Sequence, residues 1–598
     1  MKLPHPFLAT LGSMMLCGFA YAVPDHPRLL VSADDWEKLP ARMAADPVVK
    51  EIIDTCIARA KQTLGENNLT YKLEGRRLLA VSRQAIQRVL DLSAAWKVTH
   101  DRNYLNRCRD ELLNLSGLQD WHPSHHLDTA EMATAVAIGY DWLYQDLSPS
   151  DRKTIASALR EKGLVSSIAD KNARSGTNNW NQVCNGGLIL SAVALADLEP
   201  QLSEQAIQEA IHLIPRALKE GYPQDGAYSE GANYWEYGTI YTVISVEALT
   251  HAGYANPGVA RHPGFMASGR YIAELYGTSG LVFNYGDCSE RSSIKPSPSA
   301  SWIARETRSA DLRNFLLPAF RDISPIKTDR FLALAAFWFP APADVIAAPL
   351  PLHFLGSGNS PIAILRSGFA SSDIFLGIKA GMAGVSHGHM DAGSFVLDIL
   401  GQRWASDLGM QDYYSLEKRG IGLFNRDQGS DRWTVFRLNN FSHNTLTYNG
   451  KIHRADGCAK IVSFAGEPGN RTEIDLTDAL GLPAGASARR VFQFNPKSLC
   501  VTITDTLSGL KPGDTIDWNM MTHAHANVQP EGVELTLAGK TLLVSLVSSA
   551  PCKPTASPAD PPPTAHDAAN PGITRINLRA TAGKSGQLTI TAAFRQAQ

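Results

Sequence analysis

The segment from Ser386 to Asp391 reads Ser-His-Gly-His-Met-Asp and has the residue types of a metal site. In an extended backbone His387 and His389 point to the same side, because side chains repeat every two residues. Imidazole and carboxylate groups are both usual zinc ligands. Asp407 and His443 follow later in the chain and extend the candidate set. We therefore expect a divalent metal site here, the alternative being a pair of histidines in a surface loop.

A second run, Thr177 to Gly187, holds four Asn and one Gln within nine residues, among them Asn179 and Gln182. Neutral amides donate hydrogen bonds to a carboxylate without titrating. The run therefore predicts a site that binds a carboxylate. The structural alternative is a polar loop that caps the helix from Leu188 onward, because Asn and Gly favour caps and turns.

A third run, Asp225 to Tyr241, is rich in tyrosine. If the chain is helical from Ala232, then Tyr234, Tyr237 and Tyr241 share one face. Such a stripe is common in protein cores, but beside Asn233 and Glu236 it also suits a sugar-binding groove. A tyrosine hydroxyl can deliver or accept a proton when neighbouring groups lower its pKa.

The elements that must position these runs change along the chain. From about residue 30 to about 335, apolar residues recur at helical spacing, and Asp128 to Glu131 has the pattern of a capping box. Pro340 to Pro351 has the composition of a linker. The strands predicted beyond it are Phe375 to Lys379, Ser394 to Leu400, Thr434 to Leu438, Cys500 to Thr504, Val533 to Leu537 and Leu588 to Phe594. Helices first and strands second indicate a multidomain α+β chain with an antiparallel sandwich.

The composition narrows the function further. The chain has 598 residues and a formal net charge of -2, which argues against nucleic-acid binding through a broad cationic surface. Lys2, the apolar run from Phe7 to Phe19 and the sequence Ala20-Tyr21-Ala22 predict a signal peptide, residues 1–22, that is cleaved after Ala22. The run is too short to span a membrane. We expect a periplasmic or secreted protein.

Together the three runs resemble the heparinase II/III-like polysaccharide lyases. The resemblance implies an incomplete (α/α) toroid at residues 23–340, a linker at 341–352 and an antiparallel β-sandwich at 353–598. It implies an anionic polysaccharide as the partner, with no nucleic acid and no membrane span. The expected substrates contain uronic acid: heparin or heparan sulfate, chondroitin sulfate, hyaluronan, or alginate.

The resemblance also implies roles for individual residues. Asn179 is similar to the amide that neutralises the substrate carboxylate, Tyr234 to the catalytic tyrosine, and His387 to the histidine that acts opposite it. The metal ligands it implies are His389, Asp407 and His443, with zinc as the usual ion, manganese as an alternative, and a structural role. Many relatives have a His directly after the neutralising Asn, where this chain has Trp180.

The chemistry implied is β-elimination, which removes the C5 proton of a uronic acid, expels the O4 substituent and leaves a 4,5-double bond. The C5 proton is barely acidic while the neighbouring carboxylate keeps its charge, so an amide donor at Asn179 is worth about 3–4 kcal/mol in the transition state. Tyr234 is expected to protonate O4 and, for one C5 epimer, to take the proton from the same face. His387 is expected to take it from the opposite face for the other epimer.

Further substrate contacts are expected around these residues. Gln182 is a candidate for the same carboxylate contact, and Trp180 for stacking on a sugar ring. Tyr237 and Glu236 lie beside Tyr234 in the sequence, and His125 and His126 are weaker candidates for the same site. Because Arg pairs in bidentate fashion with carboxylate or sulfate, the arginines near these runs are also candidates: Arg174, Arg419, Arg426, Arg432 and Arg437.

Two other functions fit parts of the pattern. A glycoside hydrolase on a helical toroid would use a carboxylate pair drawn from Asp225, Glu230 and Glu236. A non-catalytic polysaccharide-binding protein of the cell envelope would need neither Tyr234 nor His387. The coexistence of amide, tyrosine and histidine runs favours the lyase, because binding alone needs no proton donor and acceptor. The polymer, endo or exo cleavage and the oligomeric state stay open.

Overall fold

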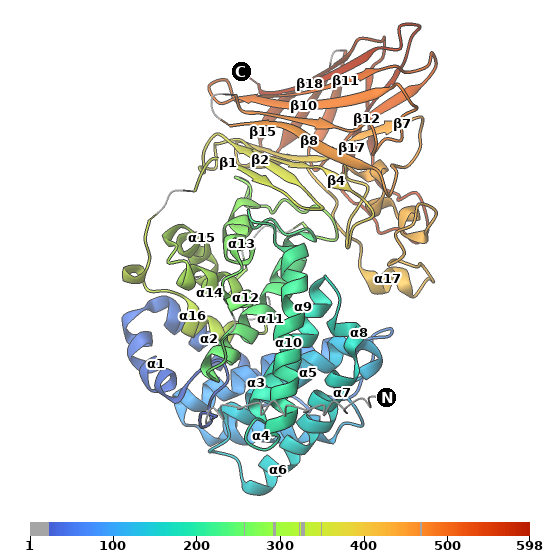
Figure 1. The fold of residues 1–598 in the computed structure, drawn as a ribbon. Helices are drawn as coiled ribbons and strands as arrows, with labels where there is room; N and C mark the ends of the chain where they lie inside the picture. Colours follow the sequence, from blue (N-terminus) through green and yellow to red (C-terminus); the bar gives the residue numbers. More distant parts are fainter. Residues whose placement is uncertain are drawn as a thin grey trace, which may run out of the picture.

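The computed structural model describes residues 23–255, 257–290, 295–321, 323, 329–347, 350–466, 469–530 and 532–597. Figure 1 shows helices in the lower part of the molecule and β-sheets in the upper part, and α17 extends from the sheets toward the helices. The predicted order of helices followed by antiparallel strands is confirmed. The predicted signal peptide lies outside the described residues.

The helices of the first part follow one another with short connections. Their bounds are α1 Ala33–Ala45, α2 Pro47–Thr63, α3 Leu79–Thr99, α4 Arg102–Gly117, η1 Pro123–His125, α5 His126–Trp142, α6 Pro149–Ala158, η2 Leu159–Val165, α7 Ser166–Ala169, α8 Lys171–Arg174, α9 Asn179–Ala194, α10 Pro200–Gly221, α11 Gly231–His251, α12 Pro257–Ala260, α13 Pro263–Glu274, α14 Pro298–Glu306, α15 Ala310–Arg321, α16 Leu332–Trp338 and η3 Pro342–Asp344.

Two kinds of helix build this part. All 17 residues of α5 are buried, and every residue of α9 except Trp180 is buried. A helix that is apolar all round must lie inside a larger core, so α5 and α9 are inner helices. By contrast α10 buries one stripe, which includes Ala206, Ala210 and Ile214, and faces outward with its other side.

The inner helices run parallel to one another. Their contacts occur in the same order along both members of each pair, and small residues such as Gly187 let the backbones approach. The contacting pairs are Gln182–Gly238 and Gly186–Tyr241 between α9 and α11, His125–Trp180 and Ala130–Gly187 between the start of α5 and α9, and Arg83–Glu131 and Val89–Gly139 between α3 and α5. The N-terminal ends of α3, α5, α9 and α11 therefore lie at one end of the helical part.

The second part contains three antiparallel sheets. Their strand orders are β1-β2-β3-β5-β6, β13-β14-β15-β18-β11-β10-β9-β8-β4 and β16-β17-β12-β7. The bounds are β1 His353–Gly356, β2 Ile362–Arg366, β3 Phe375–Lys379, β4 Gly381–Met382, β5 Phe395–Ile399, β6 Gln402–Ala405, α17 Tyr413–Glu417, η4 Asp431–Thr434, η5 Phe436–Leu438, η6 Asn440–Ser442, β7 Leu446–Tyr448, β8 Cys458–Ala465, β9 Arg471–Asp475, β10 Ser487–Asn495, β11 Cys500–Ser508, β12 Thr515–Thr522, β13 His525–Gln529, β14 Gly532–Leu537, β15 Lys540–Ser548, β16 Pro554–Pro558, β17 Thr574–Thr581 and β18 Leu588–Gln596.

The five-stranded sheet lies between the helices and the rest of the sandwich. Phe354, Ile364 and Phe375 belong to the core of the helical part, whereas Leu365 and Leu376 belong to the core of the sandwich. Because both faces are covered, β2, β3 and β5 are buried at every residue. In the nine-stranded sheet, β10 and β11 instead alternate buried residues with partly or fully exposed ones, because one face of this sheet meets solvent.

Two local predictions were wrong. The segment from Thr434 to Leu438 is part of a run of short 3-10 helices instead of a strand, and the carboxylate of Asp567 accepts the backbone N–H of Phe436. The capping box at Asp128 is absent because α5 already begins at His126. Each error follows from a side chain that binds backbone or side-chain groups distant in the sequence.

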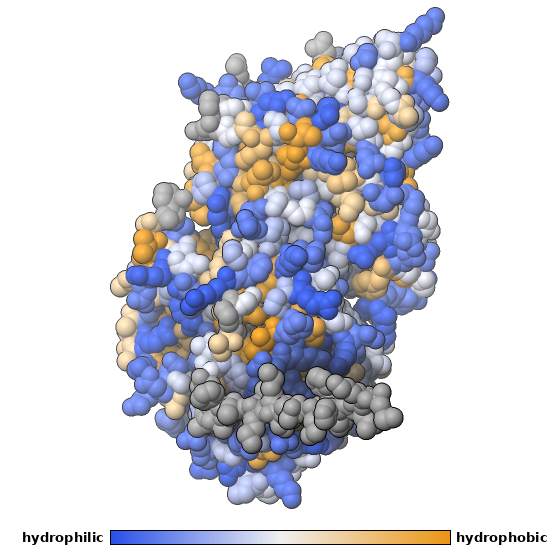
Figure 2. All heavy atoms as spheres, viewed as in Figure 1, coloured by the Kyte–Doolittle hydropathy of each residue, from blue (hydrophilic) through white to orange (hydrophobic). Residues whose placement is uncertain are grey.

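The predicted linker is held against the helices. Ile346 donates its backbone N–H to the carbonyl of Arg308 at 2.7 Å and accepts from Ala310 at 3.1 Å. Figure 2 shows that apolar side chains gather over part of the sandwich, while most of this face of the helical part is hydrophilic. Among the described residues, none of the helices has both the length and the apolar character that crossing a membrane requires.

Candidate functional site

The site forms where the N-terminal ends of the inner helices meet the sandwich. The loop between β4 and β5 carries His387 and His389, and the segment after α13 carries Asp287. These two segments are joined by a backbone hydrogen bond from Asp287 N–H to the His387 carbonyl at 2.9 Å. Helix α17 adds Tyr413, and α11 adds Tyr234 in its first turn.

The fully buried carboxylate of Asp287 holds this cluster together. Its Oδ2 accepts hydrogen bonds from Tyr413 Oη at 2.6 Å and His387 Nδ1 at 2.9 Å. Its Oδ1 accepts from His389 Nε2 at 2.9 Å and Arg432 Nη2 at 3.1 Å. Burial alone would raise the pKa of Asp287, but Arg432 and the two histidines outweigh it and hold that pKa well below its usual range. The carboxylate is therefore ionised and acts as an acceptor.

We call Asp287 and the four side chains that bind it, Tyr413, His387, His389 and Arg432, the hub. The hub orients His387. Because Nδ1 donates to Asp287, Nε2 is the nitrogen left with a lone pair, and 13% of the side chain is exposed. The prediction that His387 and His389 point to one side is confirmed, since both bind Asp287. The predicted reason was wrong, because the segment is a loop in which His387 has a left-handed φ of 57°.

Tyr234 lies face to face with His387. Their ring centroids are 3.6 Å apart, and the planes differ by 16°. Tyr234 Oη lies 2.7 Å from Tyr413 Oη. Because Tyr413 gives its own proton to Asp287, Tyr234 is the donor in this contact. Burial and the charge of Asp287 raise the pKa of Tyr234 well above its usual value, so its phenol keeps its proton at neutral pH.

The stacking of Tyr234 on His387 argues against the expectation that these two rings act from opposite faces of a sugar. Rings in van der Waals contact leave no space for a sugar between them. In this structure, Tyr234 and His387 therefore present their polar edges from the same side. The physical reason is the hub: Tyr413 contacts Tyr234 at 2.7 Å and His387 Nδ1 at 3.0 Å, and so holds the two rings together.

Asn179 of α9 lies at the same height along the helix axes as the turn of α11 that contains Tyr234. Gln182 of α9 contacts Gly238 of α11, and both helices run in the same direction, so Asn179, three residues earlier, faces the turn that contains Tyr234. The Asn179 side chain is buried, and its Oδ1 has no hydrogen-bond partner within the described parts of the chain. The structure thus brings Tyr234 and His387 into contact, and the register of α9 against α11 places Asn179 at the level of Tyr234.

The predicted metal ligands lie on the sandwich side of the hub. The rings of His389 and His443 are 5.4 Å apart, and each keeps one buried nitrogen, Nδ1 and Nε2 respectively, without a hydrogen-bond partner in the described structure. Asp407 is paired with His443 Nδ1 at 2.7 Å. Over the residues described, no three His, Cys, Asp or Glu side chains converge into a ready ligand group.

Three residues predicted to bind substrate serve the fold instead. Gln182 donates both amide hydrogens, to Tyr222 at 3.0 Å and Thr242 at 2.8 Å. Arg174 is fully buried and donates to backbone carbonyls and to Glu209. Arg437 binds Asn570 and three backbone carbonyls. The amide hydrogens of Gln182 are both used internally, Arg437 binds neighbouring groups, and Arg174 is fully buried although its Nη1 has no partner in the described structure, so these three predictions have no support.

The other predicted contacts differ among themselves. Trp180 is half-buried and packs edge-on against His125, at 5.1 Å between centroids. Tyr237 lies one turn beyond Tyr234 on α11, under the guanidinium of Arg83. Glu236 accepts a hydrogen bond from Ser297 at 2.9 Å, on a different side of α11. His126 is buried against Ser167.

The carboxylates of the hydrolase alternative do not form a pair. Asp225 accepts the backbone N–H groups of Ala227 and Ser357, each at 2.9 Å. Glu230 is buried near the Tyr228 hydroxyl, whereas Glu236 binds Ser297. These different partners give no support to an acid and a base acting together.

Sequence reasoning missed Asp287 and Tyr413 and assigned Arg432 to substrate. Asp287 follows Gly286, whose φ of 63° turns the chain toward the His387 loop, but one Asp after a Gly is not a motif. Tyr413 follows the helix cap Asp412, the one local signal that a helix begins there. Arg432 is buried and binds Asp287, Leu423 and Gly388.

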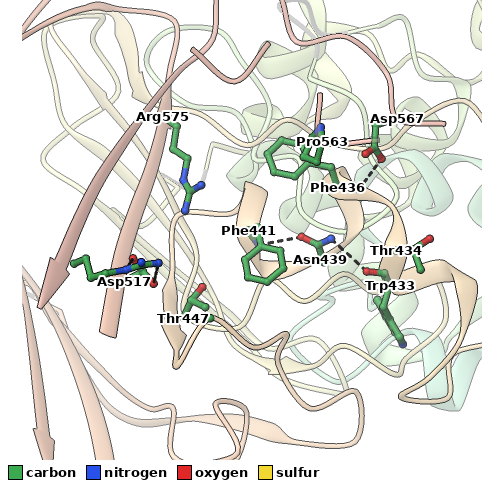
Figure 3. A pocket seen from close by; sticks show the side chains of 12 residues that line it. Trp433, Thr434, Phe436, Asn439, Phe441, Thr447, Asp517, Pro563, Asp567 and Arg575 are labelled. Atoms are coloured by element: carbon green, nitrogen blue, oxygen red, sulfur yellow. Dashed lines mark hydrogen bonds and ion pairs between the residues drawn. The ribbon is translucent and has the colours of Figure 1, made fainter. Parts of the chain in front are cut away.

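A separate pocket of about 480 Å³ lies in the sandwich. Figure 3 shows its lining, with Phe441, Phe436 and Trp433 on one side and Arg575 and Asp517 on the strands opposite. None of the predicted catalytic residues lines it. The hub is thus distinct from this pocket.

Comparisons with known proteins agree with the fold. Residues 358–560 match the family model described as heparinase II/III-like, C-terminal. A structure of heparinase III has a TM-score of 0.61 and 12% identity, covering 89% of this chain and 80% of its own. Heparan sulfate lyase HepC from Pedobacter heparinus has a TM-score of 0.58 and 12% identity, covering 92% and 84%.

Chondroitin AC lyase from Streptomyces coelicolor A3, solved with chondroitin sulphate, has a TM-score of 0.51 and 14% identity, covering 95% of this chain and 83% of its own. At these identities the likeness establishes the fold. No curated protein sequence matches the chain. The expected resemblance is confirmed: residues 358–560 match the heparinase II/III-like C-terminal domain, and the chain has the fold of heparinase III, heparan sulfate lyase HepC and chondroitin AC lyase.

Proposed function

We propose that this protein is a polysaccharide lyase that cleaves a uronic-acid polysaccharide by β-elimination. The observation that carries the proposal is the Tyr234–Tyr413–Asp287–His387 cluster, which places a protonated phenol beside an imidazole with a free nitrogen. The names of the similar structures, heparinase III, heparan sulfate lyase and chondroitin AC lyase, support the same reaction class.

Tyr234 is the proton donor to the leaving group. Its raised pKa keeps the phenol protonated, and its contact with Tyr413 holds the phenol oxygen in place, so that the hydroxyl has only to turn from Tyr413 to O4 when the sugar is bound. In the reaction this proton moves to O4 as the C4–O4 bond breaks. A positioned acid of this kind contributes about 10²–10⁴-fold to the rate.

His387 is the base. Nε2 takes the C5 proton, and the C5–H electron pair forms the 4,5-double bond, so no water is consumed. Because Tyr234 and His387 act from one side, the geometry favours a sugar whose C5 hydrogen and O4 lie on the same face, as in glucuronate or mannuronate. Iduronate and guluronate, with these groups on opposite faces, are expected to react more slowly.

Asn179 holds the carboxylate of the sugar that reacts. Its amide lies level with Tyr234, and its Nδ2 hydrogens are the donors that would meet a carboxylate, whereas the Oδ1, unpartnered within the described chain, can only accept. An amide donor on the carboxylate stabilises the charge that develops when the C5 proton leaves, and this is worth about 3–4 kcal/mol.

A divalent metal would be held by His389, Asp407 and His443. The two unpartnered imidazole nitrogens fit zinc, but the carboxylate must release His443 before it can also bind. Such an ion would fix the loop that carries His387. Metal analysis of the purified protein should give about one zinc or manganese per chain, lost in Asp407→Ala and kept in Asp456→Ala, an exposed control. A metal-free wild-type protein would end this part of the proposal.

The substrate is a polymer found outside cells, which fits the predicted export of the chain. The N-terminal sequence of the mature protein, purified from the periplasm or the medium, should begin at Val23. An intact Met1 on protein retained in the cytoplasm would contradict export.

The experiment that tests the function is a panel of heparosan, heparin, chondroitin sulfate, hyaluronan and alginate, read by the near-ultraviolet absorbance of the unsaturated product. Tyr234→Phe and His387→Ala should each reduce the rate at least about 100-fold. Tyr254→Phe, on a surface tyrosine bound to Glu204, is the matched control. Saturated products would indicate a hydrolase, and no product from any uronide would contradict the proposal.

A further inference from the structure

Two arginines in the helical part share one carboxylate. Arg330 binds Glu131 in bidentate fashion, at 2.9 and 3.0 Å, and Arg83 binds it through Nε alone at 3.1 Å. Glu131 is fully buried. In the part of the chain that the structure describes, it is the one carboxylate that ion-pairs with either arginine. Asp329 also acts electrostatically on Arg330 but forms no ion pair with it in the described structure, so the two guanidinium groups share one paired carboxylate and the charge of Arg83 is only partly balanced.

Arg83 is the arginine of the pair whose positive charge faces solvent. Its side chain is 42% exposed, compared with 17% for Arg330. Because Glu131 engages only Nε, the two terminal amino groups of Arg83 form the end that can meet another acceptor. A guanidinium that is bound only through Nε keeps its two terminal nitrogens, Nη1 and Nη2, for bidentate pairing with a carboxylate or a sulfate.

The position of Arg83 is fixed by Tyr237. The Arg83 guanidinium carbon lies 4.9 Å from the centre of the Tyr237 ring, and that of Arg330 lies 5.5 Å from it. Tyr237 is three residues after Tyr234 on α11, so the two side chains are neighbours on one helix face, with Cβ atoms about 5–6 Å apart. Arg83 therefore stands next to the proposed catalytic tyrosine.

We propose that Arg83, supported by Arg330 and the Tyr237 ring, is an anion-binding subsite for the carboxylate or sulfate of the sugar next to the one that reacts at Tyr234. This inference rests on the proposed function for the identity of the ligand. Its charge, exposure and position are independent of the reaction. Arg83 is a binding residue and takes no part in proton transfer.

The test measures binding separately from turnover. Hexasaccharides of heparosan, which carry carboxylates only, and of N-sulfated heparosan are titrated by calorimetry into the Tyr234→Phe protein, which does not consume them. Adding Arg83→Ala should weaken binding at least about 10-fold, the value of one charged hydrogen bond, and Arg83→Lys should restore part of the loss. A larger loss for the N-sulfated ligand assigns the subsite to sulfate, and an equal loss assigns it to carboxylate.

Arg305→Ala is the matched control, because Arg305 is 33% exposed and pairs with the largely buried Glu247 elsewhere in the helical part. Arg83→Ala should fold normally, since Glu131 keeps both bonds to Arg330. Binding within twofold of the parent, or a parent that binds neither hexasaccharide, overturns the subsite. If Arg83→Ala weakens binding but the wild-type protein forms no unsaturated product, the subsite stands and the proposed lyase reaction fails.

Discussion

Replacing Tyr413 by Phe removes one oxygen atom from the centre of the hub. That hydroxyl donates to Asp287 at 2.6 Å and accepts from Tyr234 at 2.7 Å. A hydrogen bond to a charged group contributes about 1.5–3 kcal/mol and a neutral one about 0.5–1.5 kcal/mol. Since Tyr413 is only partly buried, water replaces some of this, and we expect a loss of about 1–2 kcal/mol in the free energy of unfolding.

The effect on activity should be larger than the effect on stability. Without the contact to Tyr413 the phenol oxygen of Tyr234 is no longer held in place, and a misplacement of about 1 Å costs about 100-fold in rate, or about 2.7 kcal/mol. We therefore expect kcat to fall about 10- to 100-fold while KM changes little, because Tyr413 orients the acid and does not bind the sugar. The assay is the initial rate of unsaturated uronide formation on the best polymer of the panel.

Tyr414→Phe is the control for this substitution. Tyr414 is the next residue of α17, is 48% exposed and packs beside Gly75 and Lys418. It should keep the wild-type kcat. If Tyr413→Phe retains kcat within about twofold at an unchanged melting temperature, the hydroxyl does not position Tyr234, and the proton-donor argument is refuted.

Two further predictions concern the framework of the site. Burial lowers the pKa of His453 to about 4, although Nε2 donates a hydrogen bond to the Leu446 carbonyl. Because the folded protein holds His453 neutral, this residue favours the folded state above pH 6.5, and that contribution to stability is lost as the pH falls toward 4. From pH 7 to pH 4.5 this loss is about 2–2.5 kcal/mol, and urea unfolding at the two pH values should show it in the wild type but not in His453→Gln. Equal losses in both proteins would contradict the prediction. In Gly187→Ala the new Cβ would lie 2.6 Å from the Ala130 carbonyl oxygen, and this clash should lower the free energy of unfolding by about 1–3 kcal/mol and displace the start of α9. The control is Gly117→Ala, in open space at the end of α4, which should unfold like the wild type. An unchanged melting temperature for Gly187→Ala would contradict the close packing.

Much of the architecture follows from local pattern. Apolar residues at helical spacing predicted α5 and α10, and runs of β-branched and aromatic residues predicted β3, β5, β11, β14 and β18. Helix α10 and strands β11 and β18 could be predicted because their burial is periodic, whereas α5, β3 and β5 are buried throughout and stand out as continuous apolar runs. The segment from Thr434 to Leu438 could not, because its conformation depends on Asp567, which accepts from Phe436 and lies 131 residues further along the chain.

Local patterns in the chain were enough to propose an amide at Asn179, a phenol at Tyr234 and an imidazole at His387 as the groups of the site. The fold was needed to show that Asp287 and Tyr413 join two of them, that the two rings stack, and that Gln182 and Arg174 are buried in the core. The physical reason is that hydrogen bonds between distant segments depend on how helices and sheets pack, and packing leaves no short-range pattern in the chain.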